Sequence, residues 1–291
     1  MKLLRVGPAG QERPAVSQDG VFGYDLSGRL PGTPDALLSP AGQEIARAVI
    51  ARPGDTPEID LRTTRLGPPV QAPGKIVCVG LNYRAHAAEA GMAEPDEPVL
   101  FLKAPYTVQG PTDEVVIPLR GEKTDYEVEL AVVIGTAARY LASPDQALAH
   151  VLGYTISHDV SERAFQLERG GQWDKGKNCE TFNPLGPWIS TADEIRDPQQ
   201  LRLTLHVNGE PRQDSSTADM IFDVAHLVWY ISQFMALLPG DIVNTGTPQG
   251  VGSGFRPPVF LRAGDVVELA ISGLGSQRQR FRDYDPAAVP A

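Results

Sequence analysis

The sequence predicts a mostly β protein with some helix (α+β), organised as a mixed β-sandwich or roll with a small N-terminal α+β domain. Gly and Pro are frequent, with 29 and 26 copies among 291 residues, so helices are expected to be few and short. The runs between these turn residues are rich in Val, Ile, Leu and Thr, which favour strands. Strands and helices do not alternate regularly along the chain, so a doubly wound parallel sheet is not expected.

Residues 1–70 are predicted to form the small N-terminal domain around one helix. Ser39 can cap this helix, and Pro40 takes its first position, where proline is tolerated. Ile45, Val49 and Ile50 recur at helical spacing and share one face, which is typical of a helix that packs on a core. Short strands are expected on either side of this helix, at Leu3–Val6, Val21–Asp25 and Glu58–Thr63.

Residues 71–291 are predicted to form a second, larger domain. Prolines and glycines crowd residues 66–74 and prevent a strand or a helix from continuing, which places the boundary near residue 70. The Ala-rich stretch Asn82–Gly91 has helical propensity as far as its glycine. The predicted strands of this domain lie at Lys75–Val79, Val99–Leu102, Glu114–Ile117, Tyr126–Ile134, Leu152–Ser157, Leu201–Val207, Val266–Ile271 and Gln277–Phe281.

Two elements of the second half have clear local signals. Asn208-Gly209 tolerates the positive φ of a tight primed turn and predicts a hairpin. A longer helix is expected over Val224–Leu238, because Asp223 can cap it and apolar residues recur at helical spacing. Pro239-Gly240 is expected to end this helix. Its apolar face fits either the core or a subunit interface, and the sequence does not decide between them.

Charge and composition argue against several classes of partner. The formal net charge is −10 and the sequence pI is near 5.0, whereas a nucleic-acid partner would require a basic stripe. The two cysteines, Cys78 and Cys179, are far apart and offer neither a disulfide framework nor a cysteine zinc site. No signal peptide and no membrane span is expected from the apolar runs. We therefore expect a cytoplasmic protein without nucleic-acid or membrane partners.

Two glutamates share one face of the predicted strand Tyr126–Ile134. Side chains alternate along a strand, so Glu127 and Glu129 project the same way while Val128 and Leu130 face the core. Like charges this close repel each other, and a hard cation such as Mg²⁺ or Mn²⁺, which prefers oxygen ligands, would offset the repulsion. The same pattern also fits an edge strand with both glutamates in water.

A third acid, Asp159, follows the predicted strand Leu152–Ser157 and lies close in sequence to Arg163 and Gln166. Side chains that emerge at strand ends often belong to sites. Three carboxylates would half-fill an octahedral shell and leave positions for water or a chelating substrate, as in a catalytic metal site. Asp159 could instead cap a following helix. The Gly-rich run 250–254 predicts a loop, not a nucleotide site, because no helix follows it.

Five longer motifs follow one another in order along the chain. They are Gly80-Leu-Asn-Tyr-Arg-Ala-His86-Ala-Ala-Glu89, Asp125-Tyr-Glu127-Val-Glu129, His158-Asp159-Val-Ser-Glu-Arg163-Ala-Phe-Gln166, Lys177-Asn-Cys-Glu-Thr-Phe-Asn-Pro-Leu-Gly-Pro187 and Thr245-Gly-Thr-Pro-Gln-Gly-Val-Gly252. Together they closely resemble the fumarylacetoacetate hydrolase family, over roughly residues 70–282. The resemblance implies a catalytic domain of that family's mixed β-sandwich type, to which the small N-terminal domain adds little.

The resemblance also implies a metal site and an acid–base pair. Glu127, Glu129 and Asp159 match the family's three metal ligands, usually to Mg²⁺ or Mn²⁺. His86 and Glu89 match its acid–base dyad on a mobile lid segment. Their spacing of three places both on one helical face, where the carboxylate can orient the imidazole and raise its basicity.

Four further residues match positions that act on the substrate. Lys177 matches a catalytic lysine that stabilises an enolate or oxyanion. Arg163 and Gln166 match residues that position the substrate and the attacking water, and Thr247 matches a hydroxyl that binds the substrate carboxylate. The family commonly has Asp where this chain has Glu180, so the surroundings of the lysine are expected to differ.

The implied function is a metal-dependent hydrolase that cleaves a carbon–carbon bond in a 2,4-dioxo acid, an acylpyruvate-like substrate, and that forms a homodimer. The segment 169–177 resembles members that act on oxo acids from sugar-acid degradation. Decarboxylation of a 2-oxo diacid such as oxaloacetate, hydration of a 2-oxo-4-enoate and isomerisation of a 2-hydroxydienoate would use the same platform and stay open. A binding protein without catalysis on the same scaffold is the remaining alternative.

Overall fold

The computed structural model describes residues 1–32 and 36–288, and the strands within them form two main sheets and one two-stranded sheet. Two short strands, β5 (Leu66–Gly67) and β8 (Val108–Gln109), join the side of the larger, 12-stranded sheet. Across its main path the strands are β4 (Glu58–Asp60), β3 (Phe22–Asp25), β2 (Arg13–Ser17), β1 (Lys2–Val6), β14 (Asn183–Thr191), β12 (Val151–His158), β11 (Val128–Ile134), β17 (Ile242–Asn244), β6 (Ile76–Gly80) and β7 (Val99–Lys103).

The smaller sheets and the helices complete the described chain. The five-stranded sheet has the order β16 (Glu210–Ser216), β15 (Arg202–Val207), β18 (Val266–Ile271), β19 (Gly275–Asp283) and β9 (Val115–Ile117). β10 (Thr124–Asp125) pairs with β13 (Ser161–Glu162). The α-helices are α1 (Pro40–Ala51), α2 (Arg84–Glu89), α3 (Arg163–Leu167), α4 (Asp174–Lys177) and α5 (Val224–Ser232). None of the helices in the described part of the chain has the length and apolar character that a membrane span requires.

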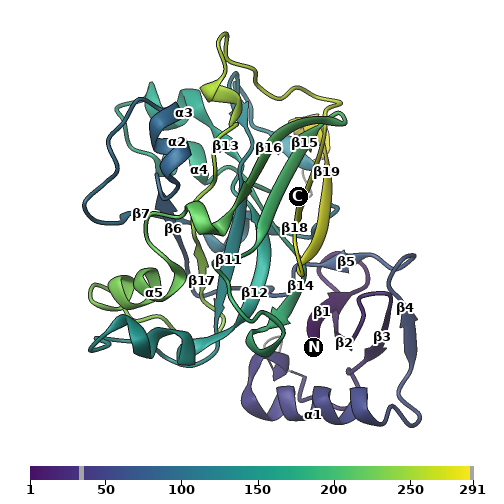
Figure 1. Cartoon of the computed structure of the whole chain (residues 1–291). Coiled ribbons are helices and arrows are strands. Elements are labelled where there is room, and N and C mark those ends of the chain that lie inside the picture. The colour runs from purple at the N-terminus through teal and green to yellow at the C-terminus, as the bar shows by residue number, and fades with distance from the viewer. Residues whose placement is uncertain (33–35, 289–291) are drawn as a thin grey trace.

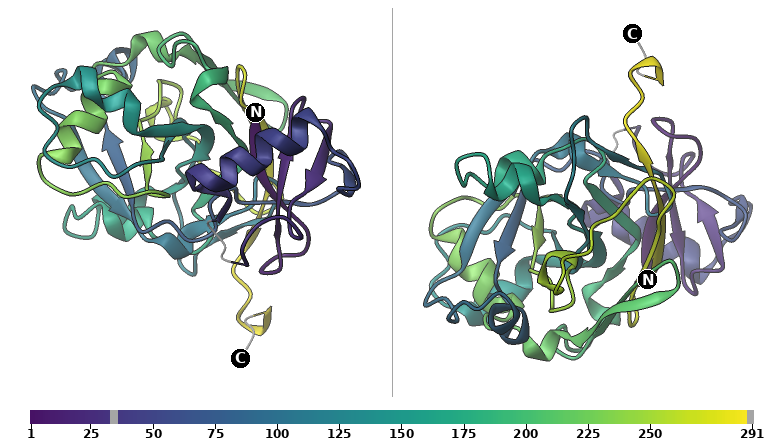
Figure 2. Two further views of the ribbon diagram at one scale, coloured as in Figure 1. Left: turned by 90° about the horizontal axis from the view of Figure 1, so that it is seen from below. Right: turned by 90° about the horizontal axis from the view of Figure 1, so that it is seen from above.

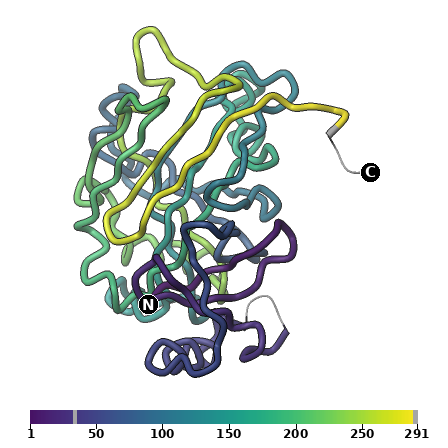
Figure 3. The backbone as a smooth tube through the Cα atoms, turned by 90° about the vertical axis from the view of Figure 1, so that its right-hand side faces the viewer, coloured from purple at the N-terminus to yellow at the C-terminus, as the bar shows by residue number. Residues whose placement is uncertain are grey.

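Hydrophobic cores lie on both faces of the larger sheet, and β11 contributes to each. Val128 and Leu130 pack toward the smaller sheet, in one cluster with Leu203 of β15. Ala131 and Val133 point to the opposite face, toward the cluster that includes α1. Figure 3 shows the β18–β19 hairpin, in yellow, running along the outside of the molecule. Two sheets that enclose a core confirm the expected mixed β-sandwich or roll.

The N-terminal residues extend the larger sheet and cover it with one helix. β1 pairs with β14 in antiparallel register, with Leu3 opposite Ile189. α1 begins as predicted, because Ser39 accepts a hydrogen bond from the Gly42 N–H at 3.1 Å, and Val49 is buried. Figures 1 and 2 show α1 lying alongside the N-terminal strands. Since the strands on its two sides belong to one sheet, the domain boundary near residue 70 stays a prediction.

The two local signals in the second half have different outcomes. Asn208-Gly209 adopts positive φ at both residues and joins β15 to β16, so the predicted hairpin is confirmed. The predicted end of the helix at Leu238 is wrong, because α5 ends at Ser232. Leu237 instead exchanges two backbone hydrogen bonds of 2.9 Å with Ala138. This long-range pairing outweighs the local helical pattern, which extends past the residue where the chain leaves the helix.

Some strands were not predicted because they contain proline. β14 carries Pro184 and Pro187, yet it pairs with both β1 and β12, with an irregularity in register opposite Tyr154 and Ile156. Proline removes a ladder hydrogen bond, and such a run normally argues against a central strand. The stretch 66–74 was expected to interrupt the fold, but its first two residues pair with β1.

Candidate active site

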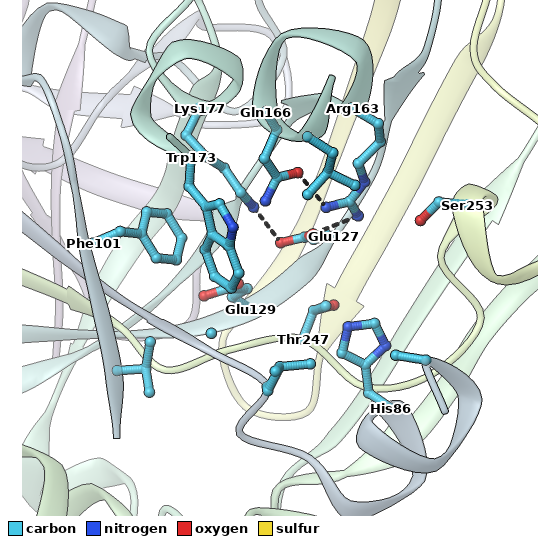
Figure 4. A pocket seen from close by; sticks show the side chains of 15 residues that line it. His86, Phe101, Glu127, Glu129, Arg163, Gln166, Trp173, Lys177, Thr247 and Ser253 are labelled. Atoms are coloured by element: carbon cyan, nitrogen blue, oxygen red, sulfur yellow. Dashed lines mark hydrogen bonds and ion pairs between the residues drawn. The ribbon is translucent and has the colours of Figure 1, made fainter. Parts of the chain in front are cut away.

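Seven of the nine predicted site residues line one pocket (Figure 4), which lies where α2, α3 and α4 meet β6, β7 and β11. Its volume of about 170 Å³ is below the roughly 300–1,000 Å³ of pockets for drug-sized ligands, and it suits a small organic acid. The remaining two, Glu89 and Asp159, are bonded directly to His86 and Lys177. The seven lining residues are His86, Glu127, Glu129, Arg163, Gln166, Lys177 and Thr247.

The three predicted metal ligands converge on one point. Carboxylate oxygens of Glu127, Glu129 and Asp159 lie within 4.8 Å of one another, and the three residues are only 5%, 1% and 0% exposed. Sheet register brings them together, because Val128 pairs with His158 and the Asp159 N–H donates to the Glu127 carbonyl at 3.0 Å. An edge strand with both glutamates in water is therefore ruled out.

Two buried lysines neutralise part of this acidic cluster. Lys177 Nζ lies 2.8 Å from both Glu127 Oε2 and Asp159 Oδ2. Lys103 Nζ donates to the other oxygen of Asp159 and to the Val160 carbonyl. Burial disfavours the charged form of Lys177, but the charges of Asp159 and Glu127 outweigh it and raise its pKa above the ordinary value. Lys177 is thus a permanent ammonium inside the pocket.

Arg163 is fixed by three partners on one side of the pocket. Its Nε donates to Asp125 Oδ2 at 2.8 Å, its Nη2 to Glu127 Oε1 at 2.6 Å and its Nη1 to Gln166 Oε1 at 3.0 Å. Burial disfavours charge on Glu127, but Lys177 and Arg163 outweigh it and lower the pKa of this carboxyl to about 2. The guanidinium is consequently committed to protein carboxylates and aligns Gln166 beside them.

Among the described residues, Glu129 is the acid of the three that has no cationic partner. Its Oε2 accepts a hydrogen bond from the Gly246 N–H at 2.9 Å, and no lysine or arginine in the described part of the chain forms an ion pair with it. Burial, together with the charges of Asp159 and Glu127, raises the pKa of Glu129 well above its ordinary value. A divalent cation with oxygen ligands would supply the missing charge, so the three acids fit a bound metal.

His86 and Glu89 form the predicted pair on α2, with Nδ1 and Oε2 3.1 Å apart. Glu89 Oε1 also accepts a hydrogen bond from the Gly250 N–H at 2.9 Å. A Cβ at Gly254 would lie 2.5 Å from Glu89 Cδ, so only glycine lets the loop approach this closely. When Nδ1–H donates to Glu89, Nε2 of His86 is left to take a proton. The Gly-rich loop 250–254 therefore positions a carboxylate.

Thr247 lines the pocket, but its hydroxyl is already bonded within the protein. It donates to the Val128 carbonyl at 3.0 Å and accepts from Gln213 Nε2 at 2.9 Å. Gln213 Oε1 accepts in turn from the Val128 N–H at 3.0 Å. To donate to a substrate carboxylate, as predicted for this residue, the Thr247 hydroxyl must first release the carbonyl of β11.

Four pocket-shaping residues were missed from the sequence. Lys103 ends an apolar strand, where a single cation could have indicated a buried partner. Asp125 lies two residues before Glu127, and it accepts a hydrogen bond from Arg163. Phe101 and Trp173 line the pocket with their rings 5.6 Å apart at 70°. No signal in the sequence relates these two aromatic residues, because β7 and α4 meet only in the folded chain.

The difference from the family pattern at Glu180 does not alter the surroundings of Lys177. Glu180 is exposed, so its longer side chain lies outside the acidic cluster. Asn178 instead fixes the turn after Lys177, because its Nδ2 donates to the Leu102 carbonyl at 3.0 Å and to the Asp174 carbonyl at 2.9 Å. These bonds join the end of α4 to β7 and hold Lys177 over the carboxylates.

Comparisons with known proteins agree on one family. The profile described as "Fumarylacetoacetate (FAA) hydrolase C-terminal" matches residues 75–282. A Burkholderia cenocepacia protein named "Putative hydrolase" is 49% identical over 284 residues, covering 97% of this chain and 99% of the relative.

Two solved structures are also similar over nearly the whole chain. Maleylpyruvate hydrolase from Sphingobium sp. SYK-6, in complex with manganese (II) ion and pyruvate, has 30% identity and a TM-score of 0.81, covering 98% of this chain and 100% of that one. The 2-hydroxyhepta-2,4-diene-1,7-dioate isomerase from Mycobacterium marinum has 32% identity and a TM-score of 0.75, covering 97% and 98%.

Proposed function

Because the chain belongs to the fumarylacetoacetate hydrolase family and is an enzyme, we propose that it is a metal-dependent hydrolase that cleaves a carbon–carbon bond in a 2,4-dioxo acid such as an acylpyruvate. One observation carries the proposal: the buried acids Glu127, Glu129 and Asp159 and the His86–Glu89 pair meet at a single small pocket. The first set suits chelation of a 2-oxo acid, and the second suits activation of water.

The metal set is proposed to be Glu127, Glu129 and Asp159, with Mg²⁺ or Mn²⁺ as the ion. Held by these three acids, the ion would supply Lewis-acid chemistry that anchors the 2-oxo acid end of the substrate and withdraws electrons from it. The manganese named with the Sphingobium relative supports this assignment. An ion also explains how an acidic pocket accepts an anionic substrate, because it reverses the local charge.

The other residues then have distinct roles in the hydrolysis. His86 Nε2 removes a proton from water, whose oxygen attacks the C4 carbonyl, while Glu89 holds the imidazolium that forms. The C3–C4 bond breaks, and its electron pair stays on C3 as the enolate of pyruvate. The ammonium of Lys177 stabilises this charge. A proton returned to C3 completes the products, pyruvate and a carboxylic acid, with Gln166 placed to align the water.

A product assay tests this proposal against its alternatives. Purified protein with Mg²⁺ is given acetylpyruvate, oxaloacetate or a 2-hydroxydienoate, beside the His86→Ala variant and a control, His206→Ala, on β15 and outside the lining of the pocket. Release of pyruvate and acetate from acetylpyruvate is expected, and His86→Ala should lower kcat by ~10²-fold or more. Glu127→Gln should lose activity and Mg²⁺ binding together, the latter measured by calorimetry.

Other outcomes would replace the proposal. Carbon dioxide from oxaloacetate without cleavage of acetylpyruvate would make the protein a decarboxylase. Conversion of the 2-hydroxydienoate alone would make it an isomerase, the second candidate, which the likeness to the Mycobacterium marinum enzyme favours. Full activity of Glu127→Gln after chelator treatment would contradict any metal-dependent mechanism.

Assembly and location are part of the same proposal. A homodimer is supported by apolar side chains left exposed at the surface, such as Phe234 after α5 and Leu102 on β7, and light scattering on the purified protein measures it. A cytoplasmic location is supported by Cys78 and Cys179, which are both free thiols. Cell fractionation with an antibody to the protein tests that location.

A further inference from the structure

The pocket has one charged side and one apolar side. The charged side carries the acidic cluster with Lys177 and Arg163. The apolar side, called here the apolar wall, consists of Phe101 and Trp173 with the backbone of Gly80. It adjoins the charged side, because Lys177 Nζ lies 5.1 Å from the centroid of the Phe101 ring. Figure 4 shows the two rings side by side next to Glu129. A substrate that binds its 2-oxo acid end at the carboxylates therefore extends along aromatic rings.

The apolar wall is built into the fold. The rings of Phe101 and Trp173 meet edge to face, with centroids 5.6 Å apart, a favourable aromatic geometry. A Cβ at Gly80 would lie 2.6 Å from Trp173 Cζ3, so glycine at this position makes room for the indole. Trp173 also directly precedes α4, whose last residue is Lys177. The wall and the ammonium are therefore fixed by one short segment.

The cations at the pocket are already paired. Arg163 binds Asp125 and Glu127, and Lys177 binds Glu127 and Asp159. Of the described residues that line the pocket, no lysine or arginine is left for a second substrate carboxylate, because Lys177 is assigned to the enolate and Arg163 is held by Asp125 and Glu127. A carboxylate against the apolar wall would lose its hydration without a partner, which is costly.

We propose that the acyl group of the substrate is uncharged and packs against Phe101 and Trp173. The inference rests on the proposed function, because it assigns the 2-oxo acid end to the acidic cluster. It excludes from the good substrates those acylpyruvates that carry a second carboxylate on the acyl chain, maleylpyruvate among them. Trp173 is thus a specificity-determining residue, and a longer apolar acyl chain gains contact with it.

A matched pair of substrates tests whether the acyl group must be uncharged. Butanoylpyruvate and succinylpyruvate differ only in ending with a methyl group or a carboxylate. The wild-type enzyme is expected to have a kcat/KM at least ~10-fold higher for butanoylpyruvate. Trp173→Ala should lower kcat/KM for butanoylpyruvate ~10-fold or more while changing that for acetylpyruvate less, and Trp173→Phe should recover most of the loss. Gln172→Ala, an exposed neighbour outside the pocket, is the control and should match wild type.

A binding measurement separates this inference from the proposed function. 2-Oxohexanoate and 2-oxoadipate have the same carbon count, differ in the terminal methyl or carboxylate, and lack the C4 carbonyl that hydrolysis requires. Calorimetry with Mg²⁺ present is expected to show tighter binding of 2-oxohexanoate, with the preference lost in Trp173→Ala. If no acylpyruvate is cleaved but this preference holds, the proposed function fails and the apolar wall stands. Equal or tighter binding of 2-oxoadipate, or equal turnover of succinylpyruvate, overturns the inference.

Discussion

Replacing Asp125 by Asn should destabilise the protein through Arg163, although no predicted ligand is changed. Asp125 Oδ2 accepts from Arg163 Nε at 2.8 Å and from the Ser253 N–H at 3.0 Å, and Oδ1 accepts from the Gly252 N–H at 2.7 Å. Asp125 itself is fully buried. An asparagine keeps one accepting oxygen, but its NH₂ group then faces an N–H donor. The guanidinium keeps its bonds to Glu127 and Gln166.

The expected loss in the free energy of unfolding follows from the removal of one partner of a buried ion pair. Removing one partner of such a pair costs about 3–5 kcal/mol. The introduced asparagine would retain the bonds that Oδ1 accepts from the Tyr126 and Gly252 N–H groups. Arg163 would retain two partners, so the loss should fall at the lower end, about 3 kcal/mol. At about 2–4 °C of Tm per kcal/mol for a chain of this size class, Tm should fall by about 6–12 °C.

Thermal unfolding of Asp125→Asn beside a surface control measures this loss. Asp60→Asn makes the same chemical change in the pair with Arg62, where both side chains reach solvent, so its Tm should stay close to wild type. Circular dichroism at 222 nm during heating gives both values. If Asp125→Asn loses no more Tm than Asp60→Asn, the buried network around Arg163 does not stabilise the fold as argued.

Three further perturbations have defined outcomes. Lys103→Met should lower the free energy of unfolding by about 3 kcal/mol, because Asp159 loses one of its two buried cations, and added Mg²⁺ should restore part of it in denaturant titrations. Burial raises the pKa of Tyr154 to about 12 from 10.0. The contribution of this tyrosine to stability is therefore fully present below pH 10 and is lost as the pH rises toward 12, and Tyr154→Phe should flatten that decline. Gly80→Ala should displace Trp173, changing its fluorescence and raising KM for butanoylpyruvate several-fold with little change in Tm.

Controls make these three outcomes decisive. Lys123→Met removes an exposed lysine paired with Glu168 and should leave the free energy of unfolding nearly unchanged. Tyr140→Phe alters a tyrosine that is 76% exposed, so its alkaline unfolding curve should follow wild type. Gly28→Ala adds a methyl group that meets nothing within 4 Å and should not alter fluorescence or KM. A variant that behaves like its control contradicts the corresponding argument.

Short sequence patterns predicted those elements whose conformation depends on neighbouring residues. The cap at Ser39 and the Asn208-Gly209 turn were found from the sequence because short-range hydrogen bonds and φ preferences determine them. The end of α5 and the proline-containing β14 were not, because pairing with distant segments decides both. Sequence patterns carry little information on such long-range pairing.

The residues of the candidate site likewise divide into those that a local pattern predicts and those that long-range pairing brings together. Strand alternation put Glu127 and Glu129 on one face, but only the register of β11 against β12 brings Asp159 beside them. Lys103 reaches Asp159 from β7, which is separated from β12 in the larger sheet by β11, β17 and β6. These cross-chain distances depend on topology, so the compensating lysine could not be predicted from its own segment.

The Gly-rich loop 250–254 joins the proposed base to the charged side of the pocket. The Gly250 N–H binds Glu89, and the Gly252 N–H binds Asp125, which in turn fixes Arg163. Backbone donors in one short loop cannot move independently of one another. A displacement of the loop would therefore release both carboxylates at once, and the imidazole and the guanidinium would lose their alignment in the same step. Glycine is needed here because a side chain would prevent the backbone from approaching Glu89.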